Sequence, residues 1–232
     1  MPYTRPPSTT TVWHRFPARG LTLRVQDLTP DLYEAAITLL RTYFTRDEPP
    51  CKYIGIEKYP SAMHELEQLW RKTLNDNVSL VCVTDDGVVV GANVLAVVCK
   101  EDKDEPFQTH DKIWAQLFGA VDLVSRGVDI FEKYGVDKYL TAYGLVVDPA
   151  WRGLGVAKEI LKARISLCRS LGIKVTATVF TARASQIAAK KAGFLDLYEM
   201  TYEELAKKGC VFPGVEEDTK SSKLMALVID EN

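Results

Sequence analysis

The chain has 232 residues, 47% of them hydrophobic, which is enough to bury one sizeable core and fits a single α/β domain better than two. Its formal net charge of −2 gives no general attraction to nucleic acids or to an anionic membrane, so we expect neither as a partner. The N-terminus lacks an apolar signal segment and no stretch approaches the roughly 20 apolar residues that cross a bilayer, so we expect a cytoplasmic protein.

The first third of the chain predicts a strand and two helices. We expect a flexible segment over residues 1–20, rich in Pro, Thr and Arg, followed by a single domain over residues 21–232. Apolar residues alternate over 21–28, as in a strand. Thr29 and Pro30 then suit the cap and first position of a helix whose apolar residues recur to Tyr43. A second helix is predicted from Ser61 to about Leu74.

The middle of the chain predicts the antiparallel part of a sheet. Residues 78–83 and 88–98 are rich in Val, and the Asp85-Asp86-Gly87 sequence between them is typical of a hairpin turn. The charged run 100–105 is interpreted as a solvated connection. Residues 107–133 should form one or two helices, divided near Gly119 or Gly127.

The junction over residues 139–163 predicts an anion site. A β-branched segment ends at Val147, Pro149 interrupts it, and apolar residues recur at helical spacing from Leu154 onward. Gly153 and Gly155 remove Cβ atoms where a ligand would approach the backbone, and the first N–H groups of the helix face outward with the positive end of its dipole. Neither a P-loop nor a complete G-x-G-x-x-G is present, so these nucleotide sites are not supported. A plain strand–turn–helix without a ligand is the alternative.

The C-terminal part predicts alternating strands and helices. Residues 173–180 are β-rich, and a helix over 184–192 precedes Gly193-Phe194. Residues 197–202 and 223–229 are predicted strands, separated by a Gly- and Pro-containing insertion over 209–222.

Cysteine and histidine spacing gives no disulfide framework and no metal site. The five cysteines are odd in number, dispersed and without a C-x-x-C pair, and the three histidines lie far apart. We interpret Cys82, Cys99 and Cys168 as small apolar residues rather than catalytic thiols.

Arg152, Gly155 and Ala157 resemble the Q/R-x-x-G-x-G/A motif of the GNAT acetyltransferases, with Ala in place of the last glycine. The order of strand, motif, long helix, strand and shorter helix ending in Gly-Phe is also that of the family. The resemblance implies an α/β (α+β) GNAT fold: a mixed, mostly antiparallel sheet with one splayed strand pair, flanked by helices. It also implies acetyl-CoA as cosubstrate, with the pyrophosphate on the turn, pantetheine along the strand, and a backbone N–H that polarises the thioester carbonyl. The implied coenzyme-binding residues are Leu145, Val146, Val147, Arg152, Gly153, Leu154, Gly155, Val156, Ala157 and Lys158.

The segment Phe44-Thr45-Arg46-Asp47-Glu48-Pro49 is similar to the F-x-x-D-E-P signature of insect-type arylalkylamine N-acetyltransferases. In that family the glutamate is the general base, which implies this role for Glu48. Asp47, grouped with the substrate-binding residues, either attracts the cationic amine or orients the loop, and we favour the second role. Without the resemblance, a loop carboxylate pair is most simply solvated charge. Pro50 stands where the family often has Leu, which leaves the loop shape and substrate preference open.

Two hydroxyl residues lie at the distances before Gly193-Phe194 at which these enzymes carry two catalytic serines. Ser185 matches the second serine, and Thr181 stands in place of the first. The alternative is that Thr181 ends a strand and Ser185 caps a helix.

The resemblance therefore implies acetyl transfer to a small primary arylalkylamine, directly within a ternary complex and without a metal. Three alternatives stay open: aliphatic, polyamine or protein amine acceptors, longer acyl-CoA donors, and an acyl-CoA-binding protein without turnover. The residues leave the oligomeric state open, and we favour a monomer.

Overall fold

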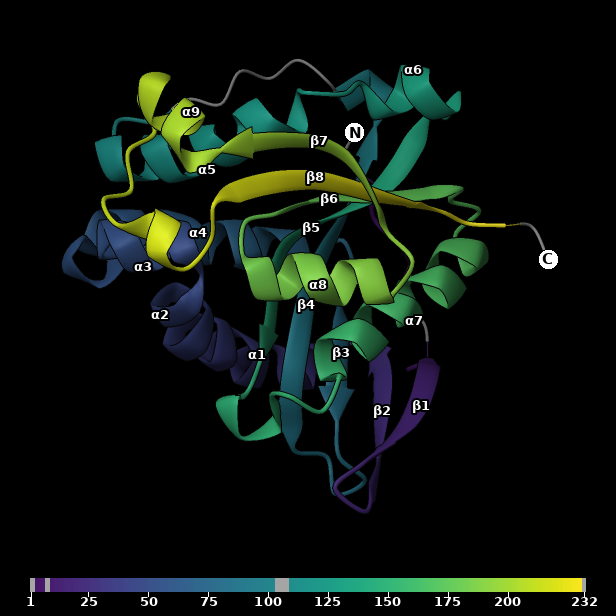
Figure 1. Cartoon of the computed structure of the whole chain (residues 1–232). Helices are drawn as coiled ribbons and strands as arrows, with labels where there is room; N and C mark the ends of the chain where they lie inside the picture. Colours follow the sequence, from purple (N-terminus) through teal and green to yellow (C-terminus); the bar gives the residue numbers. More distant parts are fainter. Residues whose placement is uncertain (1–2, 7–8, 103–108, 231–232) are drawn as a thin grey trace.

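The computed structural model describes residues 3–6, 9–102 and 109–230, and an eight-stranded sheet lies at its centre (Figure 1). The strands are β1 Val12–Ala18, β2 Leu21–Asp27, β3 Leu80–Val83, β4 Val89–Cys99, β5 Lys138–Val147, β6 Val175–Phe180, β7 Leu195–Thr201 and β8 Ser221–Val228. Their order across the sheet is β1-β2-β3-β4-β5-β6-β8-β7. Only the β5–β6 pair is parallel, and the other neighbours are antiparallel, so the expected mixed, mostly antiparallel GNAT-type sheet is confirmed.

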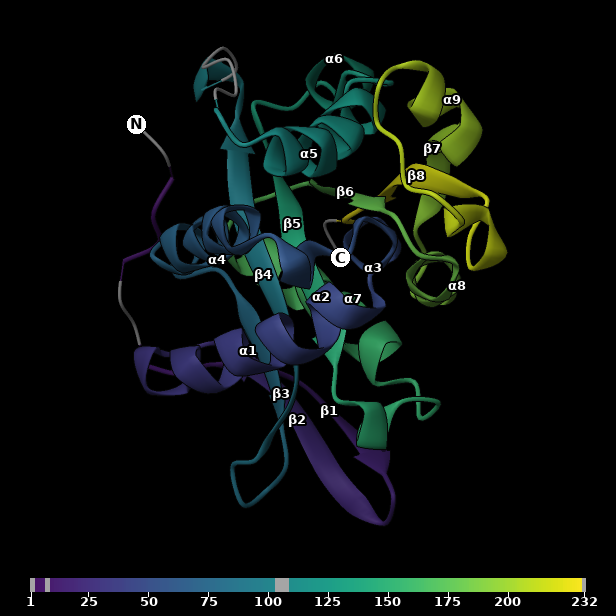
Figure 2. The ribbon, with the colours of Figure 1, turned by 90° about the vertical axis from the view of Figure 1, so that its left-hand side faces the viewer.

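Helices cover both faces of the sheet. They are α1 Tyr33–Leu39, α2 Thr45–Asp47, α3 Pro49–Ile54, α4 Pro60–Leu74, α5 Lys112–Ser125, α6 Ile130–Tyr134, α7 Val156–Ser170, α8 Arg183–Lys191 and α9 Tyr202–Lys207. Figure 2 shows α1, α4 and α5 in front of the sheet, and Figure 1 shows α7 and α8 on the other side.

The period of the strands explains these two layers. In β3, Val81 and Val83 pack into the core beneath α1, α4 and α5, whereas Leu80 and Cys82 point to the opposite face and pack with α7. Successive strand side chains alternate between faces, so one apolar strand supplies both cores. The buried residues of α7 recur at helical spacing, as the sequence predicts for a helix with one apolar stripe: Val156, Ile160, Ala163 and Leu167.

The expectation of a flexible segment over residues 1–20 is wrong for its second half. Residues 12–18 form β1, which pairs antiparallel with β2 across a turn at Arg19-Gly20, where both residues have positive φ. Pro17 weakens the strand pattern in the sequence, but β1 lies at the edge of the sheet, where a strand tolerates proline. Residues 1–2 and 7–8 of the segment lie outside the described residues.

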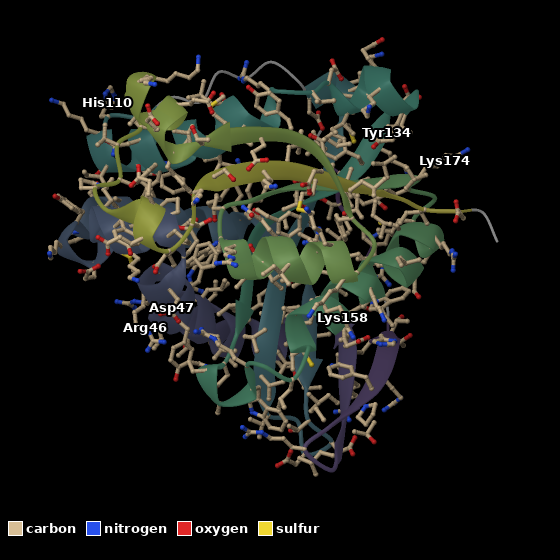
Figure 3. All side chains as sticks on the ribbon, viewed as in Figure 1. Arg46, Asp47, His110, Tyr134, Lys158 and Lys174 are labelled. Carbon is tan, nitrogen blue, oxygen red and sulfur yellow. The ribbon has the colours of Figure 1, made fainter. Side chains whose placement is uncertain are left out.

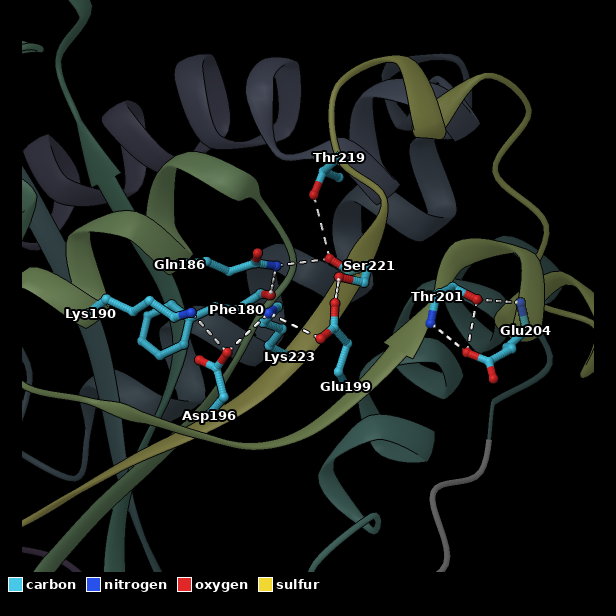
Figure 4. A network of polar contacts seen from close by, with 10 residues as sticks. All are labelled: Phe180, Gln186, Lys190, Asp196, Glu199, Thr201, Glu204, Thr219, Ser221 and Lys223. Atoms are coloured by element: carbon cyan, nitrogen blue, oxygen red, sulfur yellow. Dashed lines mark hydrogen bonds and ion pairs between the residues drawn. The ribbon is translucent and has the colours of Figure 1, made fainter.

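Most other expected elements are found, with shifted ends. The second helix is found as α4, the hairpin joins β3 to β4, and the helical stretch divides next to Gly127, after α5 ends at Ser125. The first predicted helix is not uniform, because its last turn, Leu40–Phe44, is π-helical. Helix α9 was not expected, although Thr201 and Glu204 form a capping box (Figure 4). Of the charged run, residues 100–102 form a short 3-10 turn and 103–105 lie outside the described residues.

The parallel pair β5–β6 separates almost as soon as it forms. Leu140 and Thr176 are its one paired position, although β5 continues to Val147 and β6 to Phe180. The fork between the two strands is therefore open toward the end of β5 that leads into the glycine turn. None of the helices within the described ranges is long and apolar enough to cross a bilayer.

Candidate active site

A cavity of about 620 Å³ fills the fork between β5 and β6. Its walls come from the end of β5, the glycine turn, the start of α7, the end of β6, α8, the loop around Glu48, and α5. A cleft of this size can enclose a small ligand or the reactive arm of a larger one. Segments far apart in the sequence thus meet at one site, which makes this cavity the candidate active site.

One end of the cavity is the glycine turn. Gly153 and Gly155 have φ of +77° and +81°, in the region that favours glycine, and a Cβ on Gly153 would meet no atom within 4 Å. Gly155 is the N-cap of α7, so the first amides of this helix have no partner within it. Of the ten expected coenzyme-binding residues, nine line the cavity, whereas the Leu154 side chain does not and is 38% exposed.

The backbone of β5 is irregular where it borders the cavity. The register with β4 shifts between Gly144 and Ala142, so Tyr143 is a bulged residue. The Tyr143 carbonyl accepts a hydrogen bond from Trp70 Nε1 at 2.9 Å, and the Gly144 carbonyl accepts one from Asn93 Nδ2 at 2.7 Å. Side chains thus hold the bulge, while the backbone groups on its β6 side have no strand partner.

Glu48 also lines the cavity, from the junction between α2 and α3, and is half-buried. It caps α3, and its Oε2 accepts a hydrogen bond from the Cys51 amide at 2.8 Å, while its Oε1 accepts one from Thr181 Oγ1 at 2.5 Å. Burial raises the pKa of Glu48 above its ordinary value, and the hydrogen bonds from Thr181 and Cys51 oppose that rise. The carboxyl group is therefore held in one orientation and made more basic.

The structure places the two hydroxyl residues differently. Thr181 bonds Glu48 directly, and its own carbonyl accepts a hydrogen bond from Tyr202 Oη at 2.8 Å. Gln186 holds the backbone next to Thr181 in place, because its side-chain amide donates to the carbonyls of Phe180 and Ser221 (Figure 4). Ser185 also lines the cavity, but its hydroxyl donates to the Ala182 carbonyl at 2.8 Å. Ser185 lies in the first turn of α8 and does not cap the helix, whose N-cap is Ala182 with no side-chain capping bond.

Asp47 lies beside Glu48 but is already paired. It forms ion pairs with Arg46 at 2.7 Å and with Arg152 at 2.7 Å. Figure 3 shows Arg46 and Asp47 together on the α2 side and Lys158 at the start of α7. The hydrogen bond from Arg46, more than that from Arg152, lowers the pKa of Asp47, so it is a stable anion. Its charge is compensated by two guanidinium groups before any amine arrives.

One wall of the cavity is mostly apolar and aromatic. Helix α5 contributes Trp114, Leu117 and Phe118, and the rings of Trp114 and Phe118 lie 5.7 Å apart. Tyr43 and Tyr143 line the cavity as well. This wall is not predictable from the sequence alone. The apolar stripe of α5 is a signal for a buried helix face, but it does not indicate which neighbour that face contacts.

Comparisons with known proteins agree with this geometry. The sequence model described as the acetyltransferase (GNAT) family matches residues 34–194. This chain belongs to the GNAT acetyltransferase family. Among solved structures it is similar to a putative arylalkylamine N-acetyltransferase 7 from the mosquito Aedes aegypti, with 39% identity, 99% of this chain and 100% of that chain covered, and a TM-score of 0.92.

More distant GNAT structures share the fold. The arylalkylamine N-acetyltransferase 2 of Aedes aegypti is 24% identical, with 90% of this chain and 99% of that chain covered and a TM-score of 0.78. A polyamine N-acetyltransferase of Drosophila melanogaster is 14% identical, with 89% and 100% covered and a TM-score of 0.72. GNAT enzymes use acetyl-CoA, and the open turn, the free amides of α7 and the unpaired edge of β5 fit such a carrier.

Proposed function

We propose that this enzyme transfers the acetyl group of acetyl-CoA to the primary amine of a small arylalkylamine. The observation that carries the proposal is a single cavity that runs from the glycine turn to Glu48 and ends in an aromatic wall. The turn and the first amides of α7 would hold the diphosphate, and the edge of β5 would hold the pantetheine arm. Acetyl-CoA supplies the activated acyl group.

Glu48 is the base in this proposal. An alkylamine with a lysine-like pKa of about 10.4 arrives as an ammonium ion and must lose a proton before its nitrogen can attack. The raised pKa of Glu48 makes it a better acceptor for that proton, directly or through water. The neutral amine nitrogen then forms a bond to the acyl carbon and the carbon–sulfur bond breaks. The nitrogen loses its second proton, which neutralises the leaving thiolate, so that one amide and one thiol are produced.

The charges of the cavity favour a monoamine over a polyamine. Asp47 and Glu48 are the acidic side chains among its described lining residues, and Asp47 is neutralised by Arg46 and Arg152. A second or third ammonium group would face apolar and aromatic side chains and lose its hydration without a partner. One cationic end beside Glu48 and an apolar body against Trp114 and Phe118 fit these surroundings.

Cysteine chemistry does not compete with direct transfer. Cys51 is the thiol nearest in sequence to Glu48, and burial, reinforced by the charge of Glu48, raises the pKa of its thiol well above the ordinary value. A neutral buried thiol is a poor nucleophile. We therefore propose attack by the amine itself.

The test is a thiol-release screen of the purified enzyme. Acetyl-CoA and longer acyl-CoAs are each paired with aromatic monoamines, aliphatic monoamines and polyamines. The proposal predicts the highest kcat/KM for acetyl-CoA with an aromatic monoamine. A preference for polyamines would replace the assigned acceptor, and binding of coenzyme A without thiol release from any pair would make this a binding protein.

A further inference from the structure

Arg164 is a fully buried cation in the wall of the cavity. It belongs to α7, and its side chain has no exposed surface. It lies two turns, or about 12 Å, along the helix from Val156, where the coenzyme turn ends. The proposed coenzyme-binding residues of the turn therefore do not include it.

Arg164 connects the two sides of the strand fork. Its Nη1 donates to Thr178 Oγ1 of β6 at 2.9 Å. Its Nε donates to Asn93 Oδ1 of β4 at 2.9 Å, and the Asn93 amide donates in turn to the carbonyl of Gly144 in the bulge of β5. One guanidinium group thus reaches β6 directly and the bulge of β5 through a single side chain.

This arrangement is costly for stability alone. Among the described residues no ion pair joins Arg164 to a carboxylate, and its Nη2 has no hydrogen-bond partner. Its guanidinium carbon lies over the Phe194 ring, 5.8 Å from the ring centroid. Burial lowers the pKa of Arg164 to about 9, so the group is still charged at neutral pH. The neighbouring ionisable group on the same helix is the Cys168 thiol, which is neutral because burial raises its pKa to about 12. Burying a charge without a counter-charge costs free energy, so stability alone does not explain an arginine at this position.

We infer that Arg164 is a positioning residue that holds the bulge of β5 and the diverging strand β6 at the separation needed for acyl transfer. This inference rests on the proposed function. The backbone next to the bulge is where an N–H group would face the thioester oxygen, and small errors in such a donor's position reduce catalysis strongly. A planar guanidinium can hold two acceptors on different strands at fixed angles, which neither an apolar side chain nor a rotating ammonium can do.

The experiment compares Arg164→Met and Arg164→Lys with the wild-type enzyme. Arg169→Met is the matched control, since Arg169 lies on the same helix but is exposed, and its Nε donates to the Asp230 carbonyl at 3.2 Å. Four quantities are measured: the melting temperature, the dissociation constant of coenzyme A, kcat with an aromatic amine, and the infrared stretching frequency of the thioester carbonyl in bound acetyl-CoA.

The inference predicts a separation of coenzyme binding from catalysis. Arg164→Met should fold but melt at a lower temperature, because the buried Asn93 Oδ1 loses its donor, and its dissociation constant for coenzyme A should change less than about threefold because the turn is distant. In both Arg164 variants kcat should fall by about 100-fold, and the carbonyl frequency should move toward that of free acetyl-CoA. Arg169→Met should match the wild type in all four measurements.

Two results would overturn the inference. The first is wild-type kcat and carbonyl frequency in folded Arg164→Met or Arg164→Lys, and the second is a loss of coenzyme affinity as large as the loss of kcat. If neither variant folds, Thr178→Val removes the shorter of the two hydrogen bonds from Arg164 to β6, the other being the 3.3 Å bond from Nη1 to Thr176 Oγ1. Wild-type kcat and carbonyl frequency in that variant would also overturn the inference. A wild-type enzyme that neither binds acetyl-CoA nor releases thiol would instead overturn the proposed function.

Discussion

The carboxylate of Asp47 and the guanidinium of Arg152 form an ion pair with 2.7 Å between Oδ2 and Nη1. Arg152 belongs to the glycine turn, and its Nε also donates to the Val147 carbonyl at 3.0 Å. Asp47 belongs to the loop that presents Glu48. The pair therefore links the proposed coenzyme end of the cavity to the proposed amine end, and Arg152 is engaged by a carboxylate before a phosphate can reach it.

Asp47→Asn should release Arg152 for the coenzyme. Both side chains of the pair are about one-third exposed or more, so the pair itself contributes at most about 1 kcal/mol to folding stability and the melting temperature should change little. We expect coenzyme A to bind about threefold more tightly, because a neutral amide competes less for the guanidinium. Calorimetric titration measures the effect, with the exposed Asp31→Asn as the control for net charge. Weaker binding in Asp47→Asn would show that the pair preorganises the turn instead.

Glu48→Gln should remove the base while keeping the fold. The amide of the variant can still accept a hydrogen bond from the Cys51 backbone and contact Thr181. We expect kcat/KM to fall by about 100-fold or more, and this loss would come from the missing base and not from misfolding. Since the carboxylate form is active, wild-type kcat/KM should rise with pH through a pKa above the ordinary value of about 4.3, and this limb should disappear in the variant. The exposed Glu57→Gln is the control. A variant with the wild-type pH profile would exclude Glu48 as the base.

The same substitution has a defined effect on stability. The folded-state pKa of Glu48 is raised, so its contribution to stability is complete below the unfolded value of about 4.3 and is lost as pH rises through the folded value. At neutral pH, Glu48→Gln should therefore melt at the wild-type temperature or higher. Thermal melts of the two proteins at about pH 5 and about pH 8 measure this difference, which should favour the variant more at the higher pH.

Thr181→Val should shift the acidic limb of the pH profile upward. The Thr181 hydroxyl donates to the charged carboxylate and lowers the pKa of Glu48. Without this hydrogen bond, burial should raise the pKa of Glu48 further. Thr181→Ser keeps the donor and should keep the wild-type limb. Profiles of kcat/KM against pH for the three enzymes decide the matter, and a limb that does not move in Thr181→Val would mean that this hydrogen bond does not tune the base.

The sequence predicts the parts of this site that local rules determine. Gly153 and Gly155 are required by a turn with positive φ, and α7 begins where the hydrophobic period changes. The segment Asp47-Glu48-Pro49 indicates Glu48 as a candidate base through its resemblance to a family signature. The order of strands and helices indicates the fold. These signals lie within a few neighbouring residues, so they can be interpreted without knowing the tertiary structure.

The relations between distant segments could not be predicted in this way. Asp47 was expected to attract the amine or to orient its loop, but its ion pair with Arg152 of the glycine turn was not predicted. Arg164 sits in an amphipathic helix like an ordinary surface arginine, but it is fully buried because the fork between β5 and β6 opens beside it. The wall formed by Trp114 and Phe118 depends on which side of the sheet α5 covers. Each of these results from long-range packing.

Gly153→Ala tests the coenzyme turn against a matched position. Gly153 and Gly135 have φ of +77° and +61°, and at neither would a Cβ meet an atom within 4 Å, so alanine should cost each about 1–2 kcal/mol through backbone strain alone. Gly135 ends α6 and does not line the cavity. Both variants should lose similar stability, but only Gly153→Ala should weaken coenzyme A binding, by about tenfold. Equal affinities in the two variants would remove the phosphate assignment.

Phe118→Ala should change which amines the enzyme prefers. Phe118 is half-buried in the cavity wall beside Trp114, so its ring offers an apolar surface to an aromatic acceptor. Removing that contact should lower kcat/KM for an aromatic amine by about tenfold, with a smaller loss for a short aliphatic amine that does not reach the wall. Leu123→Ala, on the same helix but outside the cavity lining, is the control. Both kcat/KM values are measured for each variant under one set of conditions. Equal losses for the two amines in Phe118→Ala would place the aromatic group of the substrate elsewhere, because a general disturbance of α5 affects every acceptor alike.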